Sequence, residues 1–338
     1  MNVVLVAGGS GGHIYPCLEM AKYFKDKGHS ILLGGKNHSM EEKIYIREGL
    51  DFIGVDVDKH KIVSQFLGIR KILDKFKIFK PDAIILFGNY ISVGFAIAAI
   101  LKRIPIYLHE QNVIYGTANK LLGIFAKKIY LSLPIKKNIY SYKSLLVGNP
   151  KGSSDVRPIK LGTRYNVVVA MGSLGSSTIN EILIKMTKII DDKIDFHLVV
   201  GKKHYSEFIN KIEDKDNVHV YDYIDNLPAY IKVADVFVSR AGATTISEIL
   251  SNSVTSILIP SPYVKNNHQM LNAQYLLDNN ACVLVEEEGL DAMNLNKAIN
   301  ELLFDYKKRL DIKMNAKRLA IANSKNKIYK DMITDYER

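Results

Sequence analysis

The first sixteen residues constrain the fold of this chain more than any other segment. Residues 3–7 form a short apolar run rich in β-branched side chains, which predicts a buried strand. This run leads directly into the glycine turn 8–12 and His13, and then into an amphipathic helical pattern over residues 17–27. This order is typical of α/β domains that bind nucleotides or phosphate groups, because glycine lets the backbone approach a ligand and a helix N-terminus favours negative charge. The imidazole of His13 in such a turn indicates chemistry as well as binding.

Strand-like and helix-like segments alternate along the rest of the chain. The predicted strands cover residues 30–33, 52–57, 83–87, 106–109 and 128–132 in the first half, and 166–170, 196–200, 219–221, 236–239, 256–259 and 282–285 in the second. This alternation predicts parallel sheets with helices on both faces. A length of 338 residues is long for one hydrophobic core, so we expect more than one domain.

One segment interrupts the alternation. Residues 148–161 are rich in Gly, Pro and Ser and have no periodicity, so we interpret them as an interdomain linker. The second half then opens as the first does, with an apolar run followed by a glycine-containing turn. We therefore expect an α/β chain of two doubly wound, Rossmann-like domains that face each other across a cleft. The expected boundaries are 1–150 and 151–310, with residues 311–338 as a charged helical tail that can pack back on the first domain.

Charge and cysteine content limit the classes of function. Residues 1–150 hold 21 Lys and Arg against 11 Asp and Glu, so most of the net charge of +11 lies in the first half. That excess fits solvated lysine-rich faces, an anionic membrane surface or a nucleic acid. Cys17 and Cys282 are far apart, which argues against a disulfide scaffold or a zinc site. There is no signal-peptide pattern, and the longest apolar run, 90–101, is too short to span a bilayer, so we expect a soluble cytoplasmic protein.

A dinucleotide site is the simplest interpretation of two glycine-rich turns, but the details disfavour it. In the first turn, Ile14 stands where the third glycine of the dinucleotide motif belongs. The second predicted strand is followed by Gly34, Gly35 and Lys36, without the acidic residue that would hold a ribose. The chain therefore does not match an NAD-dependent enzyme.

A stronger indication of a ligand site comes from residues 239–248, where a predicted strand is followed by small and hydroxylated residues that open a helix. Backbone N–H groups at such a helix start suit a diphosphate, and the carboxylate of Glu248 can accept both hydroxyls of a ribose. The competing interpretation is structural, because Thr245 and Glu248 have the spacing of a capping box. Residues 259–272 add a loop rich in amides, which suit sugar hydroxyls or are merely polar.

Taken together, these motifs resemble one family. The segments are GGSGGHIYP at 8–16, HEQN at 109–112 with Asn119 and Lys120, GNP at 148–150, MGSLGSSTIN at 171–180, RAGATTISE at 240–248 and IPSPYVKNNHQMLNA at 259–273. Their order and spacing are similar to those of the MurG family of glycosyltransferases. The resemblance implies a GT-B fold and an inverting transfer of N-acetylglucosamine (GlcNAc) from UDP-GlcNAc to the C4 hydroxyl of N-acetylmuramic acid in lipid I. The product would be lipid II, for peptidoglycan synthesis, and the resemblance implies no metal and no other cofactor.

The resemblance also implies roles for individual residues. His13 corresponds to the general base that deprotonates the acceptor hydroxyl; the alternative for His13 is a helix-start residue satisfied by the backbone. The acceptor side comprises Gly9, Ser10, Gly11, Gly12, Tyr90, His109, Glu110, Gln111, Asn112 and Asn119. The UDP-GlcNAc side comprises Ser173, Gly175, Ile224, Arg240, Gly242, Ala243, Thr244, Glu248, His268, Gln269 and Asn272. Within that set, Ile224 corresponds to the residue at the uracil, and Glu248 to the ribose carboxylate.

The chain departs from the family pattern at two places. Lys151, Gly152 and Ser153 follow the GNP motif, where the family often carries an arginine. Asn89 stands where many members have glycine. We therefore do not transfer the contacts that the family makes at those positions.

A basic amphipathic segment, residues 62–80, is the candidate membrane contact. Its apolar residues recur at helical spacing with basic residues beside them, which suits an anionic bilayer surface, although such a stripe can also face a core. The predicted contacts are Phe66, Ile69, Leu73, Lys75, Phe76 and Phe79. Because lipid I is a membrane lipid, the resemblance implies a peripheral protein on the cytoplasmic face, and it admits a cell-wall synthesis complex as a partner. No motif indicates nucleic acid.

Two other functions compete with the lipid I transferase. One is another UDP-sugar enzyme of GT-B fold, such as a glycolipid glycosyltransferase or a UDP-GlcNAc 2-epimerase. The other is a non-catalytic nucleotide-sugar binding protein. The HEQN segment and the first glycine turn favour the transferase, because an epimerase would be expected to carry catalytic carboxylates.

Overall fold

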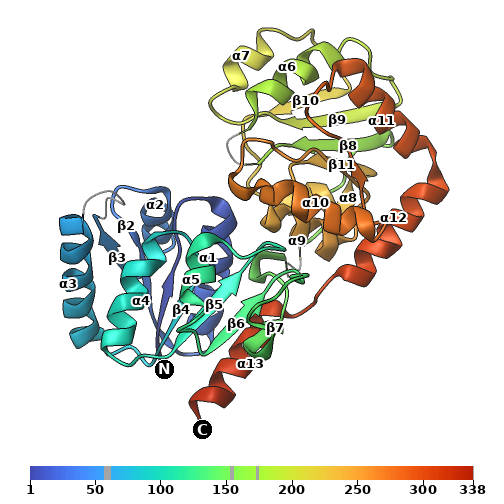
Figure 1. Cartoon of the computed structure of the whole chain (residues 1–338). Helices are drawn as coiled ribbons and strands as arrows, with labels where there is room; N and C mark the ends of the chain where they lie inside the picture. The colour runs from blue at the N-terminus through green and yellow to red at the C-terminus, as the bar shows by residue number, and fades with distance from the viewer. Residues whose placement is uncertain (57–61, 153–155, 173–174, 338) are drawn as a thin grey trace. The chain divides into compact units, whose positions relative to one another are not determined.

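The computed structural model describes residues 1–56, 62–152, 156–172 and 175–337, without the side chains of 62–66. The chain forms two compact units (Figure 1). Unit 1 comprises Met1–Ser153 and Ile321–Arg338, and unit 2 comprises Ser154–Ala320. The predicted tail 311–338 is therefore divided between the units, at a point ten residues beyond the expected boundary. Within the described ranges, no helix is both long and apolar enough to cross a membrane.

Unit 1 is built on a parallel sheet in the order β3-β2-β1-β4-β5-β6-β7. Its strands are β1 (Asn2–Val6), β2 (Ser30–Lys36), β3 (Phe52–Val55), β4 (Ala83–Leu86), β5 (Ile106–Glu110), β6 (Lys128–Leu131) and β7 (Ser144–Leu146). Six of these strands were expected from apolar runs; β7, a half-exposed edge strand of three residues, was missed, because its apolar run, residues 145–147, is only three residues long. The predicted third strand extends to residue 57, which lies outside the described residues.

Alternate residues of each strand in unit 1 serve two cores, because successive side chains point to opposite faces of a sheet. Val3 and Leu5 contribute to one core, and Val4 and Val6 to the other. The helices of the unit are α1 (Gly11–Asp26), α2 (Met40–Arg47), α3 (Ile62–Phe79), α4 (Ile91–Leu101), α5 (Thr117–Leu122) and α13 (Ser324–Tyr336), with 3-10 turns η1 (Ser141–Lys143) and η2 (Pro150–Gly152). Helices α1, α2 and α13 pack on the first core, and α3, α4 and α5 on the second.

Helix α3 decides between the two interpretations of the basic amphipathic segment. Phe76 is only 3% exposed and belongs to the second core, and Leu73 and Phe79 pack against that core. Ile69 and Lys75 are half-buried, and the side chain of Phe66 lies outside the described residues. Phe76 is therefore a core residue and not the membrane contact that was predicted, because its side chain covers the sheet. The predicted contacts at the partly buried Leu73 and Phe79 stay predictions.

Unit 2 repeats the architecture, with a parallel sheet in the order β10-β9-β8-β11-β12-β13. The strands are β8 (Tyr165–Ala170), β9 (Ile194–Val199), β10 (Val218–Tyr221), β11 (Val236–Ser239), β12 (Ser256–Leu258) and β13 (Val283–Leu284). The helices are α6 (Ser177–Met186), α7 (Tyr205–Ile209), α8 (Leu227–Val233), α9 (Ala243–Asn252), α10 (His268–Asp278), α11 (Ala292–Phe304) and α12 (Tyr306–Leu319), with the 3-10 turn η3 (Lys265–Asn267). The prediction of two Rossmann-like α/β domains is confirmed.

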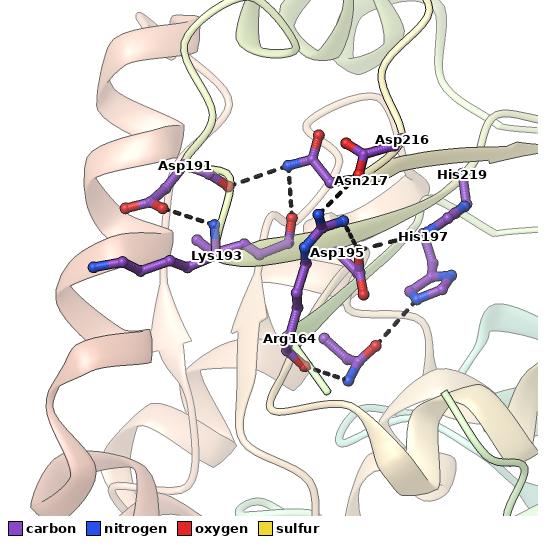
Figure 2. A network of polar contacts seen from close by, with 10 residues as sticks. Arg164, Asp191, Lys193, Asp195, His197, Asp216, Asn217 and His219 are labelled. Carbon is purple, nitrogen blue, oxygen red and sulfur yellow. Dashed lines mark hydrogen bonds and ion pairs between the residues drawn. The ribbon is translucent and has the colours of Figure 1, made fainter. Parts of the chain in front are cut away.

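A polar network ties together the amino-terminal ends of β8, β9 and β10 (Figure 2). Arg164 donates from Nη1 to Asp195 Oδ1 at 3.1 Å and from Nη2 to Asp216 Oδ2 at 2.8 Å. The rings of His197 and His219 stack with centroids 4.9 Å apart. These groups lie at or next to the strand starts, away from the carboxyl ends where α/β proteins bind ligands, so we interpret the network as structural.

The chain returns to unit 1 through α13, shown in red in Figure 1. Ile328 and Met332 are fully buried in the first core. At the helix's flank, Asp331 accepts from Lys128 Nζ at 2.6 Å and from the Tyr130 hydroxyl at 2.8 Å. The carboxyl-terminal helix is thus part of the core of the amino-terminal unit.

Truncating Met332 tests this dependence. Replacing a fully buried methionine by alanine leaves a cavity, so Met332→Ala is expected to lower the free energy of unfolding by about 2–5 kcal/mol in urea denaturation. The matched variant Met314→Ala, at a position 45% exposed on α12, should change it by less than about 0.5 kcal/mol. Equal effects of the two substitutions would contradict the burial of α13.

Candidate active site

Both sheets reverse their strand order between the first and fourth strands, which is where open α/β sheets bind ligands. In unit 1 this point lies between β1 and β4, and in unit 2 between β8 and β11. The glycine turn 8–12 and residues 87–90 follow the two strands in unit 1. In unit 2 the corresponding loops hold residues 171–176 and 240–242. The glycine turns of both halves and the start of the segment 240–248 therefore lie at these switch points.

The glycine turn of unit 1 leads into a helix earlier than expected. Helix α1 begins at Gly11, with Ser10 as its N-cap, so the predicted start near Cys17 is wrong and Pro16 lies inside the helix. Gly9 has a φ of +89°, and a Cβ there would lie 2.2 Å from Nδ2 of Asn89. Asn89 itself has a φ of +71°, which explains how asparagine can replace the glycine usual at this position.

The first turn of α1 places His13 against the end of β4. Its Nδ1 lies 2.6 Å from the carbonyl oxygen of Phe87. A carbonyl oxygen can only accept, so Nδ1 carries the proton and the lone pair of the neutral ring is on Nε2. Gly88, with a φ of +95°, permits this approach, since a Cβ there would lie 3.2 Å from His13 Cε1. His13 is therefore held by a backbone group in the tautomer that can accept a proton at Nε2.

The same carbonyl oxygen receives a second donor, from the HEQN segment. Gln111 donates from Nε2 to Phe87 O at 3.1 Å and to His109 Nδ1 at 3.1 Å. The other ring nitrogen of His109 lies 3.4 Å from Gly148 O. Full burial lowers the pKa of His109 to about 4, with a smaller contribution from His13, so the ring is neutral. His109 and Gln111 thus form a buried support behind the base rather than an exposed contact surface.

Glu110 organises the loop that follows β5. Its Oε1 accepts from the backbone N–H groups of Gln111 and Asn112, both at 3.0 Å. Its Oε2 accepts from Gly116 N at 2.9 Å and from Asn119 Nδ2 at 2.8 Å. A buried carboxylate with this many donors is fixed in place. Of the predicted acceptor-side residues beyond the glycine turn, His109, Glu110, Gln111 and Asn119 are buried, Asn112 is half-buried and Tyr90 is exposed.

In unit 2 the glycine turn passes close to the end of β9. Gly175 has a φ of +72°, and a Cβ there would lie 2.2 Å from Val200 O, so glycine is required. Ser176 caps α6 by accepting from Ile179 N at 3.5 Å. Ser173, a predicted UDP-GlcNAc contact, lies outside the described residues.

Arg240 joins the two loops at the switch point of unit 2. Its guanidinium is buried and forms an ion pair with Glu287, with Nη1 2.5 Å from Oε2. It also donates to Ser176 Oγ at 2.8 Å and to Ile259 O at 3.1 Å. The charge of Arg240 is thus neutralised within the protein. This ion pair could not be predicted from local sequence, because Glu287 lies 47 residues further along the chain in an acidic run.

Helix α9 begins at Ala243, with Gly242 as its N-cap and no side-chain cap. The capping-box interpretation of Thr245 is therefore wrong, because Thr245 already lies inside the helix. Glu248 is buried one to two turns into α9, as expected. The amino end of α9 is thus formed by small residues and backbone, at the carboxyl edge of the sheet.

The remaining predicted residues of unit 2 lie around this edge. Asn272 is buried and donates to Ala241 O at 3.2 Å, which ties α10 to the start of α9. Gln269 accepts from Ser261 N at 2.9 Å, and His268 Nδ1 lies 2.8 Å from Lys265 O. Ile224 is buried in the loop between β10 and α8. In the ranges that the structure describes, no three His, Cys, Asp or Glu side chains are grouped to hold a metal ion.

Comparisons with known proteins identify the family of this chain. Models described as the glycosyltransferase family 28 N-terminal and C-terminal domains match residues 3–131 and 166–332. The UDP-N-acetylglucosamine--N-acetylmuramyl-(pentapeptide) pyrophosphoryl-undecaprenol N-acetylglucosamine transferase of Bacillus licheniformis is 34% identical over 97% of each chain. The Bacillus subtilis protein of the same name is 31% identical over 97% of this chain and 98% of its own.

Solved structures share the fold. That of Acinetobacter baumannii MurG has a TM-score of 0.83 at 23% identity and covers 98% of this chain and 99% of its own. A putative UDP-N-acetylglucosamine 2-epimerase from Listeria monocytogenes has a TM-score of 0.73 at 10% identity, with 99% and 96% covered. Because glycosyltransferases and an epimerase share this fold, the fold alone does not choose between them.

The burial of His109 predicts a pH-dependent stability. The pKa of His109 is about 4 in the folded chain and about 6.5 in the unfolded chain. The contribution of the neutral ring to the free energy of unfolding is therefore full above pH 6.5 and is lost as the pH decreases towards 4. Between pH 6.5 and 4.5, the wild-type protein should lose about 2 kcal/mol more unfolding free energy than His109→Gln, which cannot titrate. Parallel pH profiles of the two proteins in urea denaturation would show that folding does not lower the pKa of His109.

Proposed function

The chain belongs to the MurG family of glycosyltransferases, and we infer from this that it transfers GlcNAc from UDP-GlcNAc to lipid I, forming lipid II. Curated relatives at 31–34% identity match 97% of the chain and carry this activity in their names. The family 28 domains match both halves of the chain. The acceptor atom that the family uses is the C4 hydroxyl of N-acetylmuramic acid, and the anomeric carbon is inverted.

The observation that carries the chemical proposal is the contact of His13 Nδ1 with Phe87 O. We propose that Nε2 removes the proton from the acceptor hydroxyl as its oxygen attacks the anomeric carbon. The bond from that carbon to the UDP oxygen breaks, and UDP leaves with the electron pair. The imidazolium that forms is stabilised by its Nδ1–H, which donates to Phe87 O, because this hydrogen bond becomes stronger when the ring becomes positively charged. A single displacement of this kind inverts the anomeric carbon.

The leaving diphosphate is proposed to lie at the amino end of α9. This ten-residue helix begins with Ala243 after Gly242, without a side-chain cap, so backbone N–H groups and the helix dipole can favour the negative charge of UDP. Asn272 supports this helix start from α10. Arg240, which the ion pair with Glu287 neutralises, is proposed to position the loop at Ser176.

Lipid I is membrane-bound, so we propose that unit 1 docks on an anionic membrane surface, through residues other than the stripe of α3. Helix α4 packs between α3 and α5. The exposed apolar side chains described on these helices and the turn after α5 are Leu67, Ile78, Ile97, Ile100, Leu101, Leu121, Ile124 and Phe125. Lys102, Arg103 and Lys120 are exposed beside them in the sequence. Apolar residues with basic neighbours suit an anionic bilayer.

Removing the imidazole of His13 tests the chemistry. A general base accelerates a reaction by about 10²- to 10⁴-fold, so His13→Ala should reduce kcat by that factor. The measurement is a transfer assay with UDP-GlcNAc and a lipid I analogue, with chelator present. UDP-GlcNAc affinity, measured by calorimetry, should stay within about twofold, and added imidazole should restore part of the rate. Unchanged turnover would remove His13 from the mechanism, whereas lost UDP-GlcNAc affinity would make its role structural.

Charged substitutions test the membrane surface. The double variant Leu101→Glu with Phe125→Glu should abolish most co-sedimentation with phosphatidylglycerol vesicles, because it places two carboxylates in the apolar patch. Ile189→Glu with Met293→Glu adds the same charge at exposed sites of unit 2 and should leave vesicle binding unchanged. If both double variants lose binding equally, net charge and not this patch governs docking.

A further inference from the structure

Helix α12 carries a concentration of positive charge that the transfer chemistry does not use. Unit 2 as a whole holds 20 Lys and Arg against 21 Asp and Glu. Six of those cations and only one of those carboxylates, Asp311, lie within Tyr306–Leu319. The helix is therefore strongly basic, whereas the rest of the unit is acidic. The electrostatic potential around α12 is positive as a result.

The cations of α12 are not neutralised within the protein. Among the described residues, no ion pair joins Lys307, Lys313 or Lys317 to a carboxylate, in contrast to the pairs formed by Lys211 and Lys297 in the same unit. Arg164, the arginine nearest to the starts of the strands, is already held by Asp195 and Asp216 (Figure 2). Within unit 2, α12 therefore brings together several cations for which the described residues provide no ion pair.

The exposed side of α12 also bears apolar side chains at helical spacing. Tyr306 is 70% exposed, and Leu310 and Met314 follow at intervals of four residues, both also exposed. Residues four apart lie above one another on a helix, so these three form a stripe. The buried side of the helix is formed by Ile312 and Ala316. Exposed aromatic, methionine and arginine side chains on one surface are typical of protein interfaces.

Next to the stripe lies a groove of about 200 Å³. One wall is formed by α12, with Tyr306, Arg309, Leu310 and Lys313. The facing wall comes from the ends of α8 and α9 and includes Lys232. The volume is smaller than that of a typical small-molecule pocket and suits one or two side chains of a peptide. A flat bilayer would not fill this concave groove.

The guanidinium of Arg309 is positioned at the groove by two aromatic rings. Its guanidinium carbon lies 5.7 Å from the ring centroid of Tyr165 and 5.9 Å from that of Tyr306. Two aromatic rings fix the guanidinium at little cost in entropy on binding, and its planar array of donors matches a carboxylate. Lys313 from the same wall and Lys232 from the facing wall add positive charge at the groove.

We propose that α12 and this groove form a docking site for an acidic segment of a partner protein, with carboxylates at Arg309 and Lys313 and an apolar side chain against Tyr306 and Leu310. Charge complementarity selects the acidic class, and the concave shape selects a peptide over a membrane. The site is separate from the residues assigned to transfer, so it is independent of the proposed function.

The test uses the full chain and a short fluorescein-labelled peptide that repeats Glu-Glu-Leu, with fluorescence anisotropy as the readout. Wild-type protein should bind this peptide, with weaker binding as ionic strength rises, and should not bind the Gln-Gln-Leu counterpart. Arg309→Gln with Lys313→Gln should weaken binding by about tenfold or more, since charge-assisted hydrogen bonds are lost. Transfer activity should remain unchanged in this variant.

The matched control is Lys185→Gln with Lys188→Gln, which removes the same charge at exposed positions at the end of α6. Binding to this variant should equal that of the wild type. Equal weakening by both double variants would overturn the proposal, as would equal binding of the glutamine peptide. Absence of peptide binding, with phosphatidylglycerol vesicles bound through Arg309 and Lys313, would also overturn it and assign α12 to a lipid surface.

Discussion

The active site proposed for this enzyme depends on one backbone oxygen, that of Phe87 at the end of β4. It accepts from His13, which arrives from the strand next to β4 in the sheet, and from Gln111, which follows the strand on the other side. Three neighbouring strand ends are thus joined at one acceptor. The geometry of the base is set by the sheet itself, because strand register determines where Phe87 O lies.

In unit 2 the loops at the switch point are joined by a charged side chain instead of a backbone oxygen. There the loops after β8 and β11 are joined by Arg240, whose guanidinium bonds Ser176 and is neutralised by Glu287. Removing one partner of such a buried pair would leave an uncompensated charge, at a cost of about 3–5 kcal/mol. The pair therefore fixes the loop next to α9 firmly, while the helix start itself remains formed by backbone and small residues.

Much of the fold was predictable because its signals are local. Buried parallel strands read as apolar runs such as residues 3–7, and the glycine turns mark the strand ends. Three features were not local. The stripe on α3 has the same period whether it faces a core or a membrane, and the sheet that covers Phe76 is not visible in the helix sequence. Likewise, nothing in the sequence pairs Arg240 with Glu287, and the apolar run at β7, residues 145–147, is too short to distinguish a strand from a loop.

The return of the chain through α13 has a consequence for biosynthesis. Unit 2 is continuous in sequence, whereas unit 1 needs Ile328 and Met332 to complete its first core. A ribosome delivers those side chains last, after all of unit 2 has been made. During translation the first core, which α1 and α2 also cover, therefore lacks these two side chains until all of unit 2 has been made. Chaperone protection of nascent chains would be needed most for the half that is made first.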